Sequence, residues 1–177
     1  MNSKVKLVGH AIHPMLIVFP LGLLATSFLF DIIRVAGGPV GFGVAAFYMI
    51  AAGVIGGLVA AVFGLVDWLA IPKGTRAKYV GALHGIGNVV VVGLFVISWG
   101  LRYVDPSYPG SAAFILSLLG VLLALATGWL GGELVERLGV GVDNGAHVDS
   151  PSSLGELPAT AKWVPSKEGG PLRPRRA

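Results

Sequence analysis

Six side chains that can ligate a metal or hold a proton lie within or beside otherwise apolar stretches of the sequence. They are His10, His13, Asp67, His84, Asn88 and Glu133. Zinc and iron accept imidazole and carboxylate ligands together, and neutral imidazole also ligates haem iron. Polar groups are costly inside a membrane, so such residues indicate either a functional site or a specific packing element.

The spacing of these residues predicts that they share one depth. His84 and Asn88 are four residues apart and share a helix face, and His10 and His13 share one if their helix begins early enough. The imidazoles fall near the starts of helices and the carboxylates near the ends, where the helix dipole disfavours both charged forms by about 0.3–1 kcal/mol each. This placement favours neutral imidazoles, and a joint His–carboxylate site would satisfy both groups. No comparable polar layer is expected at the other end of the helices.

The composition indicates an integral membrane protein. Of the 177 residues, 54% are hydrophobic and 12% are charged, and the mean hydropathy is +0.79. Soluble domains carry roughly a quarter charged residues, so a soluble globular chain and a disordered one are both excluded. The sequence has no cysteine, which excludes disulfides, Cys-ligated zinc and iron–sulfur clusters.

Four long runs contain no Asp, Glu, Lys or Arg. They cover residues 7–30, 35–66, 79–101 and 106–132, and each exceeds the roughly 20 residues that a helix needs to cross a bilayer. They predict membrane spans at about 14–33, 43–71, 80–103 and 112–134. The expected fold is all-α, an antiparallel four-helix bundle over residues 1–140. We expect the first span to be a retained helix, not a cleaved signal, and to kink at Pro20.

The basic residues predict the orientation of the bundle. With four spans, eleven Lys and Arg residues fall on the side of the termini and only Arg34 and Arg102 on the other. By the positive-inside rule both termini are expected in the cytoplasm, with the protein in the bacterial inner membrane. Residues 141–177 are rich in Pro, Ser and Gly, and we expect a disordered cytoplasmic tail. The net charge of +4 then reflects topology and contact with membrane lipids, not nucleic-acid binding.

A stripe of small residues in the second span ends on one of the candidate ligands. Gly53, Gly57, Ala60, Gly64 and Asp67 recur at steps of four and three residues. Small residues allow close helix–helix approach in lipid. Asp67 is therefore expected to face another helix. The stripe fits packing inside one bundle and equally a homo-oligomer.

Several sequence motifs together resemble a known family. They are HAIHP at 10–14, FPLG at 19–22, GLVD at 64–67, the His84 and Asn88 pair, GWLGGEL at 128–134 and GVGV at 139–142. Over about residues 8–143 the chain resembles the bacterial family named domain of unknown function 2231, predicted membrane proteins with four spans. The resemblance implies that fold and a redox neighbourhood, because some members are fused to a Rieske iron–sulfur domain after the fourth span. In relatives the position of Glu133 can be His. The present chain has no Cys, so its tail is not a Rieske domain.

Two functional interpretations remain open from the sequence. In the first, the bundle is a redox-associated module that binds haem b through His13 and His84, with His10 and Asn88 nearby, or a divalent metal ion, and meets a redox protein partner. The metal ligands would be His10, His13, Asp67, His84 and Glu133. In the second, the polar layer only fixes helix register in a structural or partner-binding bundle. Glu133 would then pair with Arg137, and Asp67 with Lys73. The sequence leaves open whether the protein is an enzyme, since it has no nucleophile motif, P-loop or dinucleotide fingerprint.

Overall fold

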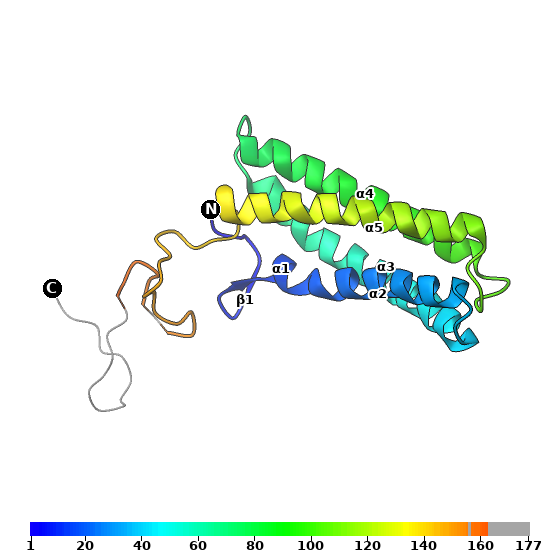
Figure 1. The fold of residues 1–177 in the computed structure, drawn as a ribbon. Coiled ribbons are helices and arrows are strands. Elements are labelled where there is room, and N and C mark those ends of the chain that lie inside the picture. The colour runs from blue at the N-terminus through cyan, green and yellow to red at the C-terminus, as the bar shows by residue number, and fades with distance from the viewer. Residues whose placement is uncertain (156, 163–177) are drawn as a thin grey trace, which may run out of the picture.

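The structure is a computed structural model that describes residues 1–155 and 157–162 (Figure 1). In this part of the chain, four helical segments are long and apolar enough to cross a membrane. The elements are β1 (Lys6–Leu7), β2 (His10–Ala11), α1 (Ile12–Leu16), α2 (Val18–Val35), α3 (Val40–Ala70), α4 (Arg76–Leu101), α5 (Ser111–Gly132) and the π-helix η1 (Glu133–Arg137). The predicted all-α fold class is confirmed, because the described residues are mostly helical and include four candidate membrane spans.

The helices lie side by side as two hairpins. The first hairpin comprises α1, α2 and α3, and the second comprises α4 and α5; the closest packing is within each hairpin. Figure 1 shows the α2–α3 and α4–α5 turns at one end of the bundle, and the N-terminus, the α3–α4 turn and η1 at the other. We call these the turn end and the N-terminal end. This arrangement is what an up-and-down bundle requires.

Helix boundaries follow local signals. Gly37 has φ +93°, a left-handed conformation that suits glycine after the end of α2, and Pro39 precedes the first turn of α3. Thr75 caps α4, because its side chain accepts a hydrogen bond from the Lys78 backbone N–H at 3.2 Å. The helical segments begin and end within four residues of the predicted spans.

The first span is interrupted near its start. The α-helix breaks at Ile17, between α1 and α2. Pro20 lacks the backbone N–H that would bond to the Leu16 carbonyl in a continuous helix. The break therefore lies where the predicted proline kink removes a helical hydrogen bond, and it sets α1 as a separate short turn that carries His13.

The core lies between the two hairpins. Leu24, Ile50, Val91 and Phe95 form a buried cluster, one from each of α2 and α3 and two from α4. Gly53 and Gly120 permit close approaches in this core, because a Cβ on either would lie 2.7 Å from Leu24 or Phe95 respectively. Many large apolar side chains point outward, for example Val18, Ile55, Val89 and Leu125. An apolar exterior of this kind is suited to lipid.

The segment after η1 has no helix or strand in its described part. Over residues 141–155 and 157–162 it consists of turns and irregular chain. Its first residues are hydrogen-bonded to the N-terminal segment: the Met1 amino group donates to the Gly139 carbonyl at 2.6 Å, and the Gly141 N–H donates to the Met1 carbonyl at 2.8 Å. Residue 156 and residues 163–177, which include most of the basic residues of the predicted disordered tail, lie outside the described residues.

Candidate functional site: two facing imidazoles

His13 is held against α3 by its own ring nitrogen. The short helix α1 carries it, and its Nδ1 lies 2.9 Å from the Ala60 carbonyl oxygen of α3. The ring packs on Gly64, one helical turn further along α3, where a Cβ would come within 2.8 Å of the imidazole. Gly64 therefore provides the space in which the ring lies, and any side chain at this position would displace it.

His84 is held against α5 in the same way. Its Nδ1 lies 2.8 Å from the Thr127 carbonyl oxygen, and the ring packs on Gly131, where a Cβ would lie 3.1 Å away. In both cases the carbonyl and the glycine are four residues apart on the supporting helix. Each hairpin thus presents one anchored imidazole at the N-terminal end of the bundle.

The two imidazoles face each other across the hairpin boundary. Their ring centroids are 6.3 Å apart and the ring planes are perpendicular. Because a carbonyl oxygen only accepts hydrogen bonds, Nδ1 of each ring carries a proton. In the neutral ring Nε2 then holds the free lone pair. An Nδ1–H bond to a carbonyl is the usual device that orients a metal-ligating histidine.

Asn88 and Thr127 extend the polar network around His84. The Asn88 amide nitrogen lies 3.2 Å from His84 Nε2 and donates to the His84 carbonyl at 2.9 Å. The Thr127 hydroxyl donates to Asn88 Oδ1 at 3.1 Å. Asn88 therefore lies in contact with the ring, as expected from its spacing, whereas the participation of Thr127 was not predicted. Its position on α5 could have been inferred only from the helix packing.

Asp67 binds the N-terminal segment instead of a neighbouring cation. It accepts hydrogen bonds from the Ser3 hydroxyl at 2.7 and 2.9 Å and from the Lys4 N–H at 2.8 Å. Ser3 is buried as a result. The predicted alternative of a pair with Lys73 is not found, and Asp67 instead fastens the chain start across the end of α3.

The remaining two candidates also have their own partners. Glu133 pairs with Arg76 of α4 at 2.7 Å, not with Arg137. His10 lies in β2, outside the helix that carries His13, and its exposed ring contacts the Ser153 hydroxyl at 3.3 Å. Within residues 1–155 and 157–162, no three His, Cys, Asp or Glu side chains are grouped so as to hold one metal ion. The five residues considered as metal ligands are thus divided among separate contacts, and His13 and His84 alone face each other.

The turn end contains a polar layer that the sequence analysis did not anticipate. Arg102, which caps α4, forms a two-pronged ion pair with Asp31 of α2, with nitrogen–oxygen distances of 2.5 and 2.8 Å. Both side chains are almost completely buried. Arg102 also donates to the hydroxyls of Ser98 and Ser117 at 3.0 and 2.9 Å. The expectation of no polar layer at this end is wrong, because Asp31 and Arg102, at the ends of their spans, neutralise each other inside the bundle.

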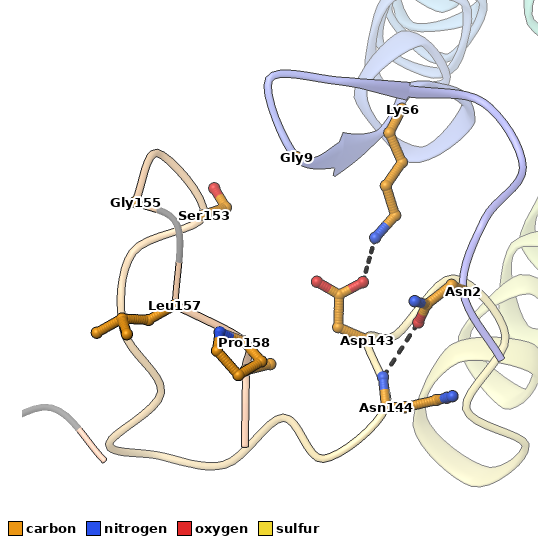
Figure 2. Close-up of a pocket in the computed structure, with 10 residues that line it drawn as sticks. Asn2, Lys6, Gly9, Asp143, Asn144, Ser153, Gly155, Leu157 and Pro158 are labelled. Carbon is orange, nitrogen blue, oxygen red and sulfur yellow. Dashed lines mark hydrogen bonds and ion pairs between the residues drawn. The ribbon is translucent and has the colours of Figure 1, made fainter. Parts of the chain in front are cut away.

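The N-terminal segment and the chain after η1 enclose a small open pocket beyond the bundle (Figure 2). Its volume is about 310 Å³. Figure 2 shows Lys6 pointing toward Asp143, with which it forms an ion pair, and Asn144 donating its N–H to Asn2. The pocket lining holds no imidazole and no pair of carboxylates. These contacts serve to hold the two segments together.

Comparison with known proteins gives one match. A family model described as "Predicted membrane protein (DUF2231)" matches residues 9–144, which includes all four spans and both facing imidazoles. No curated protein and no solved structure matches the chain.

Proposed function

The chain belongs to the DUF2231 family of predicted membrane proteins, and we propose that it is a membrane-embedded redox module in which His13 and His84 ligate one haem iron. The observation that carries this proposal is the pair of imidazoles facing each other, each oriented by an Nδ1–H bond to a backbone carbonyl. Haem is favoured over a bare metal ion by the number of protein ligands that the site offers.

The separation of the rings places both imidazoles within reach of one bound group. Their centroids are 6.3 Å apart, and among the described residues no third His, Cys, Asp or Glu side chain joins them. One imidazole from each hairpin would therefore hold the haem.

The number of protein ligands also favours haem. A zinc or iron ion held by protein needs at least three protein ligands. Two imidazoles suffice for a haem, whose porphyrin supplies four further nitrogens. When bound, haem supplies one-electron transfer, at a potential that the protein sets through the axial ligands and their hydrogen bonds. The residues of this chain would fix the tautomer of each imidazole and exclude water from the two rings.

One contact favours a second function. Asn88 lies within hydrogen-bond distance of His84 Nε2, so that nitrogen already has a donor. The imidazole pair could on this basis serve only to fix the register of the two hairpins in a structural or partner-binding bundle. The two functions differ in whether purified protein carries a cofactor.

The orientation and cellular context belong to the same proposal. The excess of basic residues on the N-terminal side supports placement of that end in the cytoplasm of a bacterial inner membrane. The imidazole pair would then exchange electrons with a partner near the cytoplasmic surface. A redox protein is the partner class that a haem at this depth requires.

The test is the cofactor content of the purified full-length protein. Protein produced in haem-sufficient cells should show a Soret absorption band and one haem per chain. His13→Ala and His84→Ala should each abolish it, whereas His147→Ala, an exposed histidine far along the chain, should not. Colourless protein that remains colourless after incubation with haemin would refute the proposal and support the structural function.

A further inference from the structure

The second hairpin repeats the first at constant sequence offsets. In the first long helical segment of each hairpin, counterparts are 71 residues apart: His13 and His84, Leu24 and Phe95, Asp31 and Arg102. In the second helix they are 67 residues apart: Gly53 and Gly120, Ala60 and Thr127, Gly64 and Gly131. The offsets differ by four because the interval between counterparts is shorter in the second hairpin, 18 positions from Arg102 to Gly120 against 22 from Asp31 to Gly53.

Contacts inside the hairpins repeat with the same offsets. The bond from His13 Nδ1 to the Ala60 carbonyl, at 2.9 Å, corresponds to the bond from His84 Nδ1 to the Thr127 carbonyl, at 2.8 Å. The approach of Gly53 to Leu24 corresponds to that of Gly120 to Phe95, each with 2.7 Å available for a Cβ. The repetition therefore concerns three-dimensional packing, not only residue spacing.

Contacts between the hairpins are reciprocal. Phe28 of α2 packs on Phe114 of α5 with ring centroids 5.3 Å apart. The counterparts of Phe28 and Phe114 are Trp99 of α4 and Phe47 of α3, whose ring centroids are also 5.3 Å apart. When residue i contacts j and the counterpart of j contacts the counterpart of i, the two surfaces are related by a twofold axis.

A residue that contacts its own counterpart must lie at that axis. Two contacts in the bundle have this property. At the N-terminal end His13 faces His84, and at the turn end Asp31 pairs with Arg102. The first pair consists of identical residues, whereas the second consists of residues of opposite charge.

We infer that the two hairpins are copies of one unit related by an internal twofold axis, and that the Asp31–Arg102 pair makes the first hairpin bind the second and not a like hairpin of another chain. Two copies of the first hairpin would bury two carboxylates against each other, and two copies of the second would bury two guanidinium groups. A buried unpaired or like-charged group is strongly unfavourable, so only the unlike pairing is permitted. This inference does not depend on any ligand.

The side chains around Asp31 and Arg102 determine which other substitutions must accompany an exchange of these two residues. Arg102 uses the hydroxyl of Ser117, whose counterpart in the first hairpin is Ile50, and the hydroxyl of Ser98, whose counterpart is Ser27. Both counterparts are fully buried. An exchange of Asp31 and Arg102 should therefore be accompanied by Ile50→Ser and Ser117→Ile, which moves the whole layer to the other side of the axis.

The first experiment compares single charge reversals with the exchanged layer in the full-length chain. Asp31→Arg and Arg102→Asp alone should each lower the yield of monodisperse, detergent-extracted protein by at least about tenfold, because a buried charge has no partner. The fourfold variant D31R/I50S/R102D/S117I should restore most of that yield. Asp105→Arg, which reverses the charge of an exposed residue at the same end, is the control and should leave the yield unchanged. An exchanged layer no better than the single reversals would overturn the twofold relationship.

The second experiment tests specificity directly. The neutral pair Asp31→Asn with Arg102→Gln keeps hydrogen-bonding groups but removes the charges. Two differently tagged copies of this variant, co-expressed, should co-purify several-fold more than two tagged wild-type copies, because like hairpins no longer repel. Equal co-purification of the folded variant and the wild type would show that the pair does not determine which hairpins associate.

Discussion

The imidazole rings of His13 and His84 lie edge to face with their centroids 6.3 Å apart, and each is anchored by Nδ1 to a carbonyl of the adjacent helix in its own hairpin. The two anchors are independent of each other, since Ala60 lies on α3 and Thr127 on α5. The distance between the rings is therefore set by the packing of the hairpins. Changes that shift either ring should alter the site without unfolding the bundle.

Glycine substitutions beside the rings should displace them selectively. A Cβ at Gly64 would lie 2.8 Å from His13, and one at Gly131 would lie 3.1 Å from His84, whereas one at Gly132 would contact nothing within 4 Å. Gly64→Ala should reduce haem content most and lower the unfolding free energy by about 1–3 kcal/mol. Gly131→Ala should have a smaller effect and Gly132→Ala none. Haem per chain and thermal unfolding in detergent measure these effects, and equal values for all three variants would contradict the ring placement.

Removal of Asn88 should free the nitrogen of His84 that would ligate. The Asn88 amide nitrogen lies 3.2 Å from His84 Nε2, so this contact must be given up before that nitrogen can bind a metal group. Asn88→Ala should therefore bind haemin at least as tightly as the wild type in a titration. Asn144→Ala, in the segment after η1, is the control and should match the wild type. Weaker binding by Asn88→Ala would contradict Nε2 as the ligating atom.

Asp67→Ala should release the N-terminal segment. The Asp67 carboxylate accepts hydrogen bonds from Ser3 and from the Lys4 N–H, and Ser3 is buried in that contact. Without it, residues near Lys4 and Lys6 should be cleaved by trypsin several-fold faster, while the helices remain protected. Asp143→Ala, which removes only the partner of Lys6, should have a weaker effect. Identical cleavage rates in wild type and Asp67→Ala would show that other contacts hold the segment.

Reporter fusions should test the proposed orientation. A reporter after Val140 and one at the N-terminus should both be active in the cytoplasm, and a reporter inserted near Pro106 should be active on the opposite side. The physical reason is the accumulation of Lys and Arg at the N-terminal end. A reporter after Val140 that is active outside the cytoplasm would place the imidazole pair at the outer surface.

Much of the fold follows from the sequence. The charge-free runs are long enough to cross a bilayer, and inside a bilayer a helix satisfies the backbone hydrogen-bonding groups of such a run internally. The same reasoning located His13, His84 and Asn88 at one depth. It could not assign partners to Asp67 and Glu133, because these partners are Ser3, in an irregular segment, and Arg76, at the start of a different helix. The Asp31–Arg102 pair was missed although its signal was present: both residues follow a histidine of the imidazole pair at the same interval.

Electron paramagnetic resonance of the ferric full-length protein tests the central claim most directly, because it reports which axial ligands the haem iron has. Two imidazole ligands should give a low-spin signal. In His13→Ala and in His84→Ala, loaded with haemin, that signal should be replaced by a high-spin signal or disappear, while His10→Ala should retain it. A high-spin signal in the wild type, or a low-spin signal that persists in both His13→Ala and His84→Ala, would contradict the assignment of these two residues as ligands.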